Sequence, residues 1–278
     1  GGGTPPPPPP APNTSPSLAS GGGTEGQEGA LIPVTAANLS ATDAETTNPS
    51  QLVYSVSALS NGFIVLALPG GGVAVTFSFT QADVNAGRVL FAHDGSETIA
   101  GSFTVTVADP NGAVSSPVVV PIAITPTNDA PVLVNNNFNI QEGGATVLSG
   151  ANLSAADVDN AAAGLVFTVS GVTGGQFELA GNPGVAITSF TQAQVTGGQV
   201  VFVDDGNEVA PGFSISVGDG VASTPAVPAN VVFSGVNDAP VLVNNALTVG
   251  EGGSIVLDGS DLSATDVDNA AAGLVFTV

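Results

Sequence analysis

A domain-length segment occurs more than once in this chain, and this repetition limits the possible folds more than any other feature. The sequence TNDAPVLVNNNFNIQEGG, which begins at Thr127, returns as VNDAPVLVNNALTVGEGG from Val236, and Asp129 and Asp238 are 109 residues apart. The segment at 151–169 recurs nearly unchanged at 260–278. Because solenoid repeats are only roughly 20–50 residues long, each copy is expected to be a whole domain in a tandem array.

A more diverged copy precedes these two. FTQADVNAGRVLFAHDGSE at 79–97 matches FTQAQVTGGQVVFVDDGNE at 190–208. The first copy shows no PVLVNN strand, and a head rich in Gly and Pro stands in its place. We therefore divide the chain into an extended linker or stalk at 1–24, repeat 1 with an incomplete first strand at 25–128, repeat 2 at 129–237 and a partial repeat 3 at 238–278.

Within each copy the pattern is typical of β-strands. Runs such as LVFTVS and FSISVG combine β-branched and aromatic residues, and Gly-containing turns separate them. About seven such strands fit one β-sandwich, so the predicted fold class is all-β. One helical turn is expected at 80–87, capped by Thr80, and Tyr54 is expected in the core. Asn38 and Asn152 begin N-x-S sequons at equivalent positions, for which a turn role is sufficient.

Charge excludes several classes of function. The chain has 23 acidic residues, one basic residue and a net charge of −22, with no Cys. Nucleic acids and anionic lipid surfaces need cations that it lacks, and no apolar run is long enough to insert into a membrane. His93, the only His, is expected to be a solvent-facing strand residue, and Arg88 to pair with a nearby acid. No signal peptide is visible, and the chain reads as an excerpt of a longer protein.

Enzyme chemistry is not expected. Paired carboxylates can act as the acid and the nucleophile of a glycosidase, but such sites add aromatic platforms for sugar rings. Aromatic residues make up 5% of this chain, and nearly all are Phe at repeated core positions.

The segment at 79–112 resembles the repeat of the chondroitin sulfate proteoglycan ectodomain. The stretch FTVTVADPNGAVSSPVVVPIAITPTNDAPVL at 103–133 resembles the last two strands of a cadherin-like domain with its linker. Arrays with NDAPVL linkers and LSATDVDN motifs look like large secreted adhesins and surface proteins of bacteria. This resemblance implies tandem cadherin-like (immunoglobulin-like) Greek-key β-sandwiches in a linear array, located outside the cell.

The resemblance also implies calcium (Ca²⁺) bound between successive domains. At the first junction the matching positions are Glu28, Asp94, Glu97, Asn128, Asp129, Asp157, Asp159 and Asp219. At the second they are Glu142, Asp205, Glu208, Asn237, Asp238, Asp266 and Asp268. Repeat 1 departs from the pattern, with Asp43-Ala44-Glu45 in place of Asp-Val-Asp. The linkers read NDAP rather than the longer NDNAP, so one metal per junction is expected to be lost.

Elementary chemistry favours calcium as well. Carboxylate and amide oxygens, the ligands that calcium prefers, recur at fixed spacings, and so large a negative charge opposes compaction unless cations offset it. We expect a calcium-stiffened extracellular stalk or fibre that projects or self-associates for cell adhesion, in contact with neighbouring repeats of a longer chain. The alternative is a glycan- or protein-binding module for a cell-surface partner. Strand exchange between the two incomplete ends would build a filament.

Overall fold

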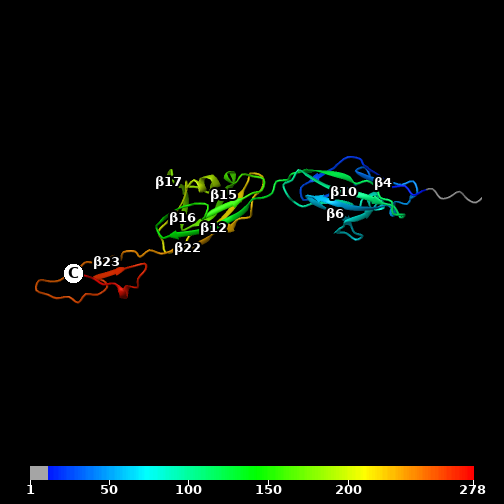
Figure 1. The fold of residues 1–278 in the computed structure, drawn as a ribbon. Coiled ribbons are helices and arrows are strands. Elements are labelled where there is room, and N and C mark those ends of the chain that lie inside the picture. Colours follow the sequence, from blue (N-terminus) through cyan, green and yellow to red (C-terminus); the bar gives the residue numbers. More distant parts are fainter. Residues whose placement is uncertain (1–11) are drawn as a thin grey trace, which may run out of the picture. The chain divides into compact units, whose positions relative to one another are not determined.

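The computed structural model describes residues 12–278. These residues fall into two units whose boundary in the sequence lies between Thr127 and Asn128, and each unit is described by itself (Figure 1). The hexaproline stretch at 5–10 lies outside the described residues. Both units are built from short, mostly antiparallel strands with a few helical turns, which confirms the all-β fold class.

The first unit is a sandwich of two main sheets (Figure 1, where β10 and β6 mark one sheet each). One sheet has the order β2-β11-β10-β5-β8, made of β2 (Thr24–Gln27), β11 (Val118–Thr125), β10 (Ala100–Ala108), β5 (Val53–Ser60) and β8 (Ser78–Thr80). The other has the order β3-β9-β6-β7, made of β3 (Leu31–Pro33), β9 (Val89–His93), β6 (Gly62–Ala67) and β7 (Val73–Val75).

Alternation along the strands builds the core of this unit. In β10 every second side chain is buried, as a strand with one face on a core requires. The large buried side chains include Tyr54, Phe79, Phe91 and Phe103, and the rings of Tyr54 and Phe79 stack with centroids 4.8 Å apart. The prediction that Tyr54 lies in the core is confirmed.

The first unit contains a strand that we did not predict. Ser17–Ser20 forms β1, which pairs antiparallel with β4 (Leu39–Thr42), and Leu18 lies opposite Ala41. In the second unit Leu133 lies opposite Ala155 in the same way, so SPSLAS is the diverged counterpart of APVLVN. The expectation of an incomplete first strand is therefore wrong for residues 17–20. The position that a donated strand would fill in repeat 1 holds the chain's own β1, which removes the reason for expecting strand exchange there.

The second unit repeats the sandwich with three small sheets. The first has the order β14-β12-β22, made of β14 (Leu153–Ala156), β12 (Val132–Gln141) and β22 (Asn230–Ser234). The second has the order β13-β19-β16-β17, made of β13 (Ala145–Val147), β19 (Val200–Asp204), β16 (Gly175–Leu179) and β17 (Asn182–Ala186). The third has the order β18-β15-β20-β21, made of β18 (Ser189–Thr191), β15 (Val166–Thr173), β20 (Gly212–Gly218) and β21 (Val227–Pro228).

Phenylalanine fills the core of this unit. Phe177 contacts four other rings in edge-on or tilted arrangements, those of Phe138, Phe190, Phe202 and Phe213. At the end of the chain, β23 (Val241–Asn245) pairs with β24 (Leu262–Thr265), as β12 pairs with β14.

The short helices lie in connections. The predicted helical turn is α1 (Gln81–Asn85), and Thr80 caps it by accepting from the backbone N–H of Asp83, which confirms that prediction. In the second unit α2 (Gln192–Thr196) repeats the arrangement. Single 3-10 turns are η1 (Pro49–Gln51) in the first unit and η2 (Ala162–Gly164) and η3 (Ala271–Gly273) in the second. The turn role expected for Asn38 and Asn152 is confirmed too, because their side-chain oxygens accept from Thr35 and Ser149 respectively.

Candidate metal centre

Three carboxylates of the second unit converge where β12 ends. Glu142 follows β12, which pairs in parallel with β22, and its Oε2 accepts from the backbone N–H of Val236 at 2.7 Å. Glu208 lies in the turn after β19, and Asp238 lies in the NDAP segment after β22. Ligand oxygens of Glu142, Glu208 and Asp238 all lie within 4.8 Å of one another. One ion could therefore contact all three.

The electrostatics of this group disfavour three bare charges. The neighbouring Glu142 carboxyl, partial burial and the charges of Asp268 and Asp238 raise the pKa of Glu208 to about 7. No cationic side chain is at hand, because the sequence has no Lys and its single Arg, Arg88, pairs with Asp83 in the first unit. The predicted pairing of Arg88 with a nearby acid is thereby confirmed.

A second set of oxygens adjoins Asp238. Its backbone N–H donates to Oδ2 of Asp268 at 2.6 Å, and the Oδ1 of Asp266 accepts from the backbone N–H of Asp268 and from Asn269. The Nδ2 of Asn269 donates to Oδ1 of Asn237. Hydrogen bonds of 2.6–3.3 Å thus connect Asn237, Asp238, Asp266 and Asp268, next to the Glu142–Glu208 pair.

The same set occurs one repeat earlier, at the start of the second unit. Asp129 donates its backbone N–H to Asp159 at 2.7 Å, and Asn128 donates Nδ2 to Asp219 at 2.7 Å. This bond and the backbone N–H groups of Ala222 and Val221 hold the pKa of Asp219 below its usual range. The Oδ2 of Asp157 is buried with no hydrogen-bond partner. An ionised oxygen buried without a partner costs free energy, and a bound cation would satisfy it.

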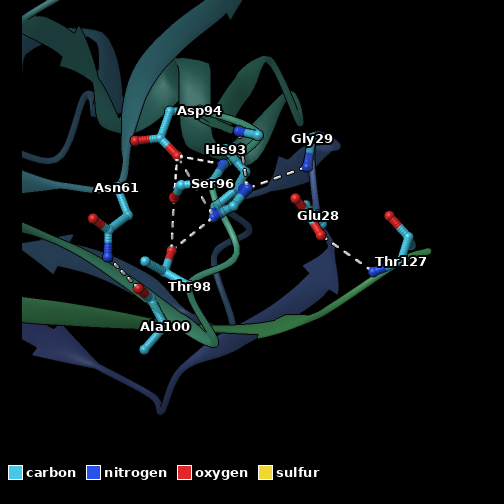
Figure 2. Close-up of polar contacts among 10 residues, drawn as sticks. Glu28, Gly29, Asn61, His93, Asp94, Ser96, Thr98, Ala100 and Thr127 are labelled. Atoms are coloured by element: carbon cyan, nitrogen blue, oxygen red, sulfur yellow. Dashed lines mark hydrogen bonds and ion pairs between the residues drawn. The ribbon is translucent and has the colours of Figure 1, made fainter. Parts of the chain in front are cut away.

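In the first unit the structure brings Glu28 and Glu97 together, with ligand oxygens within 4.8 Å. Glu28 accepts from the backbone N–H of Thr127 at 3.2 Å, as Glu142 accepts from Val236. Asp94 is turned elsewhere: its Oδ1 accepts from the hydroxyl and the N–H of Ser96, which lowers its pKa (Figure 2).

His93 connects the strand and turns that carry these glutamates. Its side chain is fully buried, so the prediction of a solvent-facing residue is wrong. Nδ1 accepts from the N–H groups of Gly29 at 3.1 Å and Gly95 at 3.3 Å, and Nε2 contacts Thr98 at 3.2 Å (Figure 2). An Nδ1 that accepts carries no proton, so the structure requires the Nε2–H tautomer. His93 thereby ties the turn at Glu28-Gly29 to the turn that leads to Glu97.

Asp204 is the counterpart of His93 in the second unit, and sequence reasoning did not single it out. It is buried, and its Oδ1 accepts from the N–H groups of Gly143 at 2.8 Å and Gly206 at 3.0 Å, while Oδ2 has no partner. Its neighbour Asp205, a predicted ligand, instead accepts from the N–H of Asn207 and lies outside the three-carboxylate group. The sequence DDGNE offers two adjacent acids, and only the strand register shows which one points inward.

Asn13 and Thr14, which sequence reasoning missed, complete a diverged set with the acids of the first unit. The hydroxyl of Thr14 donates to Glu45 at 2.7 Å, and Asn13 accepts from Asn111. Burial raises the pKa of Asp109, but hydrogen bonds from Asn13 and nearby backbone N–H groups outweigh it, and the net shift is downward. Asp43 and Asp109 each keep one buried oxygen without a partner. The signal was PNTSP, which matches TNDAP with Thr14 in place of Asp129.

The donor chemistry of these sets fits calcium. Every candidate atom is a carboxylate or amide oxygen, the kind that calcium binds in sixes to eights, and the sulfur and imidazole donors that favour zinc are lacking at these positions. The unpartnered oxygen of Asp157 and the raised pKa of Glu208 both indicate negative charge that a divalent cation would offset.

Two sandwiches in tandem, each followed by a short proline-containing segment with acidic residues, define the class of tandem β-sandwich repeat proteins. A cadherin-like family profile matches residues 16–124 and 131–233. The chain therefore belongs to the cadherin-like family. Its first match begins just before β1, in agreement with the pairing described above.

Animal extracellular matrix and surface proteins are among the relatives. Human "Chondroitin sulfate proteoglycan 4" is 32% identical over 53% of this chain and 6% of its own length. Mouse "Extracellular matrix organizing protein FRAS1" is 28% identical over 96% of this chain and 7% of its own length. Human "FRAS1-related extracellular matrix protein 1" is 28% identical over 78% of this chain and 11% of its own length. The chain thus spans only a small part of each of these relatives. Because they are extracellular matrix and surface proteins, the predicted extracellular location is confirmed.

The solved structures that this chain matches include Drosophila N-cadherin EC1-4, at 16% identity over 81% of this chain and 50% of that chain, with a TM-score of 0.43. The D00-D0 domain of intimin matches 77% of this chain and 96% of that one at 14% identity, with a TM-score of 0.30. Among the described residues, no helix has the length and apolar character needed to cross a membrane.

Proposed function

We propose that this chain is a structural module of an extracellular stalk or fibre, stiffened by calcium between consecutive repeats. The observation that carries the proposal is the convergence of Glu142, Glu208 and Asp238 within 4.8 Å in a chain whose single Arg already pairs with Asp83. A bound calcium ion would supply two positive charges and accept lone pairs from these oxygens.

The protein's own residues determine what such an ion would connect. Glu142 belongs to the end of β12, Glu208 to the turn after β19, and Asp238 to the segment that leaves the sandwich. Holding all three fixes this segment against the domain that precedes it. Asn237, Asp266 and Asp268 extend the ligand set into the following repeat. By sequence equivalence the same role falls to Glu28, Glu97, Asn128, Asp129, Asp157, Asp159 and Asp219.

Calorimetric titration of the whole chain with calcium tests the site. The double variant Glu142→Gln/Glu208→Gln keeps shape and hydrogen-bonding capacity but removes two charges, and we expect it to lose binding at this junction. The matched control Glu25→Gln/Asp258→Asn removes two acids that lie outside the proposed sets, and it should bind as the parent does. Equal binding by the parent and both variants, or no binding by the parent, would contradict the proposal.

The mechanical part needs a separate measurement. Ala239 precedes Pro240 in the NDAP segment, which biases its backbone to an extended conformation. We expect small-angle scattering to give a larger maximum dimension in calcium than in chelator. The bacterial setting and the adhesion role rest on the NDAPVL and LSATDVDN motifs, whereas FRAS1 and its relatives support matrix organisation. Both settings call for a non-catalytic array in contact with neighbouring repeats or matrix proteins.

A binding module is the second candidate, and one observation favours it. The first unit carries an exposed apolar face whose four strands contain no Asp, Glu, Lys or Arg, and the counterparts of these strands in the second unit contain polar residues.

A further inference from the structure

The outer face of the sheet β3-β9-β6-β7 in the first unit is apolar throughout. Ile32, Phe91 and Ile64 lie opposite one another in the register and point into the core. The adjacent row points outward, since successive side chains alternate between faces, and it includes Leu31 and Phe63, which are 49% and 50% exposed. The four strands contain no Asp, Glu, Lys or Arg.

The face extends onto β7 at the edge of the sheet. Val65 of β6 lies opposite Val75, and Ala67 lies opposite Val73. Val75 is 61% exposed, and Phe77, two residues further along, is 62% exposed. We define the apolar face by its exposed side chains, Leu31, Phe63, Val73, Val75 and Phe77.

The second unit shows that the fold does not require this face. There Gln176 and Glu178 flank the core residue Phe177, where Phe63 and Val65 flank Ile64. Ala186 pairs with Glu178 as Val75 pairs with Val65. Thr188 is the counterpart of Phe77. The carbonyl of Thr188 accepts from the N–H of Val169 in β15, as the carbonyl of Phe77 accepts from the N–H of Val56 in β5. Exposed Phe63 and Phe77 in one copy thus correspond to Gln176 and Thr188 in the other, and Val75 corresponds to the smaller Ala186, which indicates a partner rather than a folding requirement.

The edge strand itself is unprotected. β7 is the last strand of its sheet, and the stretch GGGVAVTF at 70–77 contains neither a charge nor a Pro. The backbone N–H of Thr76 donates to Ile64 of β6, so by alternation the N–H of Val75 points away from the sheet. The corresponding edge β17 contains Pro183, which cannot donate. Exposed apolar edges of this kind pair with other strands.

We propose that the first unit self-associates with a second copy of this chain through β7 and the apolar face. Net charge selects the partner. A chain of charge −22 repels its own copies over most of its surface, and the apolar face is where two copies can meet without bringing like charges into contact. Two identical edges can pair antiparallel about a two-fold axis, which brings the apolar side chains of both edges together on one face of the joined sheet.

The size of the patch determines the strength of the contact. Exposed apolar patches of monomers measure roughly 300–600 Å², below the ~800 Å² that each partner buries in stable complexes. A single pair therefore binds weakly, and repetition along a fibre or over a surface raises the avidity. This association needs no calcium, so it stands apart from the metal proposal.

Sedimentation equilibrium of the whole chain in chelator tests the proposal, from micromolar to millimolar protein, at low and at high sodium chloride. We expect a monomer–dimer equilibrium that strengthens with salt, because screening removes repulsion and leaves the apolar contact intact. The variant Phe63→Gln/Phe77→Thr, which installs the residues of the second unit, should weaken dimerisation at least tenfold. Val75→Pro removes the outward N–H and should weaken dimerisation in the same way. Val221→Thr alters an exposed Val of the second unit and should dimerise normally.

Thermal melts by circular dichroism check that each variant folds. A parent chain that stays monomeric at all concentrations in high salt overturns the proposal, as does a dimer that both folded variants leave unchanged. The calorimetric titration reports calcium binding independently, so failure of one proposal does not hide the outcome of the other.

Discussion

Glu208 makes the second unit sensitive to pH in a direction opposite to that of most acids. Its pKa is raised from 4.5 to about 7 by Glu142, burial and the charges of Asp268 and Asp238, so the folded chain holds a proton that the unfolded chain has already lost. Stability falls with pH where the folded state binds more protons. We therefore expect the metal-free protein to lose stability as pH rises from about 4.5 to about 7.

Thermal melts in chelator at a series of pH values measure this effect. Glu208→Gln should flatten the fall across that window, and saturating calcium should do so as well by offsetting the same charge. Because the ion competes with the proton on Glu208, calcium affinity should decline below neutral pH. A parent chain whose stability rises steadily over the window would contradict this account of Glu208.

His93 offers a second test at the scale of one residue. Its Nδ1 accepts the backbone N–H groups of Gly29 and Gly95 in two partly buried hydrogen bonds. His93→Ala leaves both without an acceptor and opens a cavity, so we expect a loss of about 2–4 kcal/mol in the free energy of unfolding of the first unit. His93→Asn restores an acceptor and should recover part of this loss. Urea denaturation measures both variants; equal losses would mean that packing alone accounts for His93.

At the scale of elements, close approach at the start of β6 explains a glycine. A Cβ on Gly62 would lie 2.4 Å from the Phe91 ring and 2.5 Å from the carbonyl oxygen of Ala92. Gly62→Ala must therefore displace β6 from β9, and overpacking of this kind typically costs about 1–3 kcal/mol. Gly164→Ala is the control, because nothing lies within 4 Å of its added Cβ. The two variants should differ in urea midpoint, and matching midpoints would show that β6 has room to shift.

The two copies also show how elements tolerate change. In the first unit Gln81 accepts from the N–H of Ala41 and from the hydroxyl of Tyr54, both at 2.6 Å. In the second unit its counterpart Gln192 accepts from the N–H of Ala155 only, because Phe167 takes the place of Tyr54. The bond from Gln to the β4 or β14 backbone is thus the shared feature, and the Tyr hydroxyl is an addition. Tyr54→Phe should cost only about 0.5–1.5 kcal/mol in the free energy of unfolding, as measured by urea denaturation.

At the scale of the whole molecule, calcium should raise the melting temperature. An ion that binds only the folded chain stabilises it by about 2.7 kcal/mol per site at a hundred times its dissociation constant. We expect a clear upward shift in millimolar calcium and a smaller one in equal magnesium, which demands a tighter octahedral site. Circular dichroism melts measure both, and Glu142→Gln/Glu208→Gln should lose part of the calcium shift. Identical melts in calcium and chelator would mean that the acids are plain surface charge.

Much of the fold followed from periodicity. Alternating apolar residues placed β15 and β20 as strands, Thr80 marked the helical turn, and Tyr54 was recognised as core. These features depend on local pattern, which duplication copies intact. β1 escaped because SPSLAS shares only one apolar residue, Leu18, with the strand it matches, and that residue is recognisable only once it is paired with Ala41.

The amino-acid sequence by itself determined the repeat, the all-β class and the presence of recurring carboxylates, because strand alternation, turn residues and charge can be recognised from short segments of the chain. Only the tertiary structure decided which acids meet. Glu142, Glu208 and Asp238 come from segments far apart in the chain, and Asp204 rather than Asp205 points inward. The burial of His93 and the exposure of Phe63 depend likewise on strand register, where a shift of one residue exchanges the two faces of a strand.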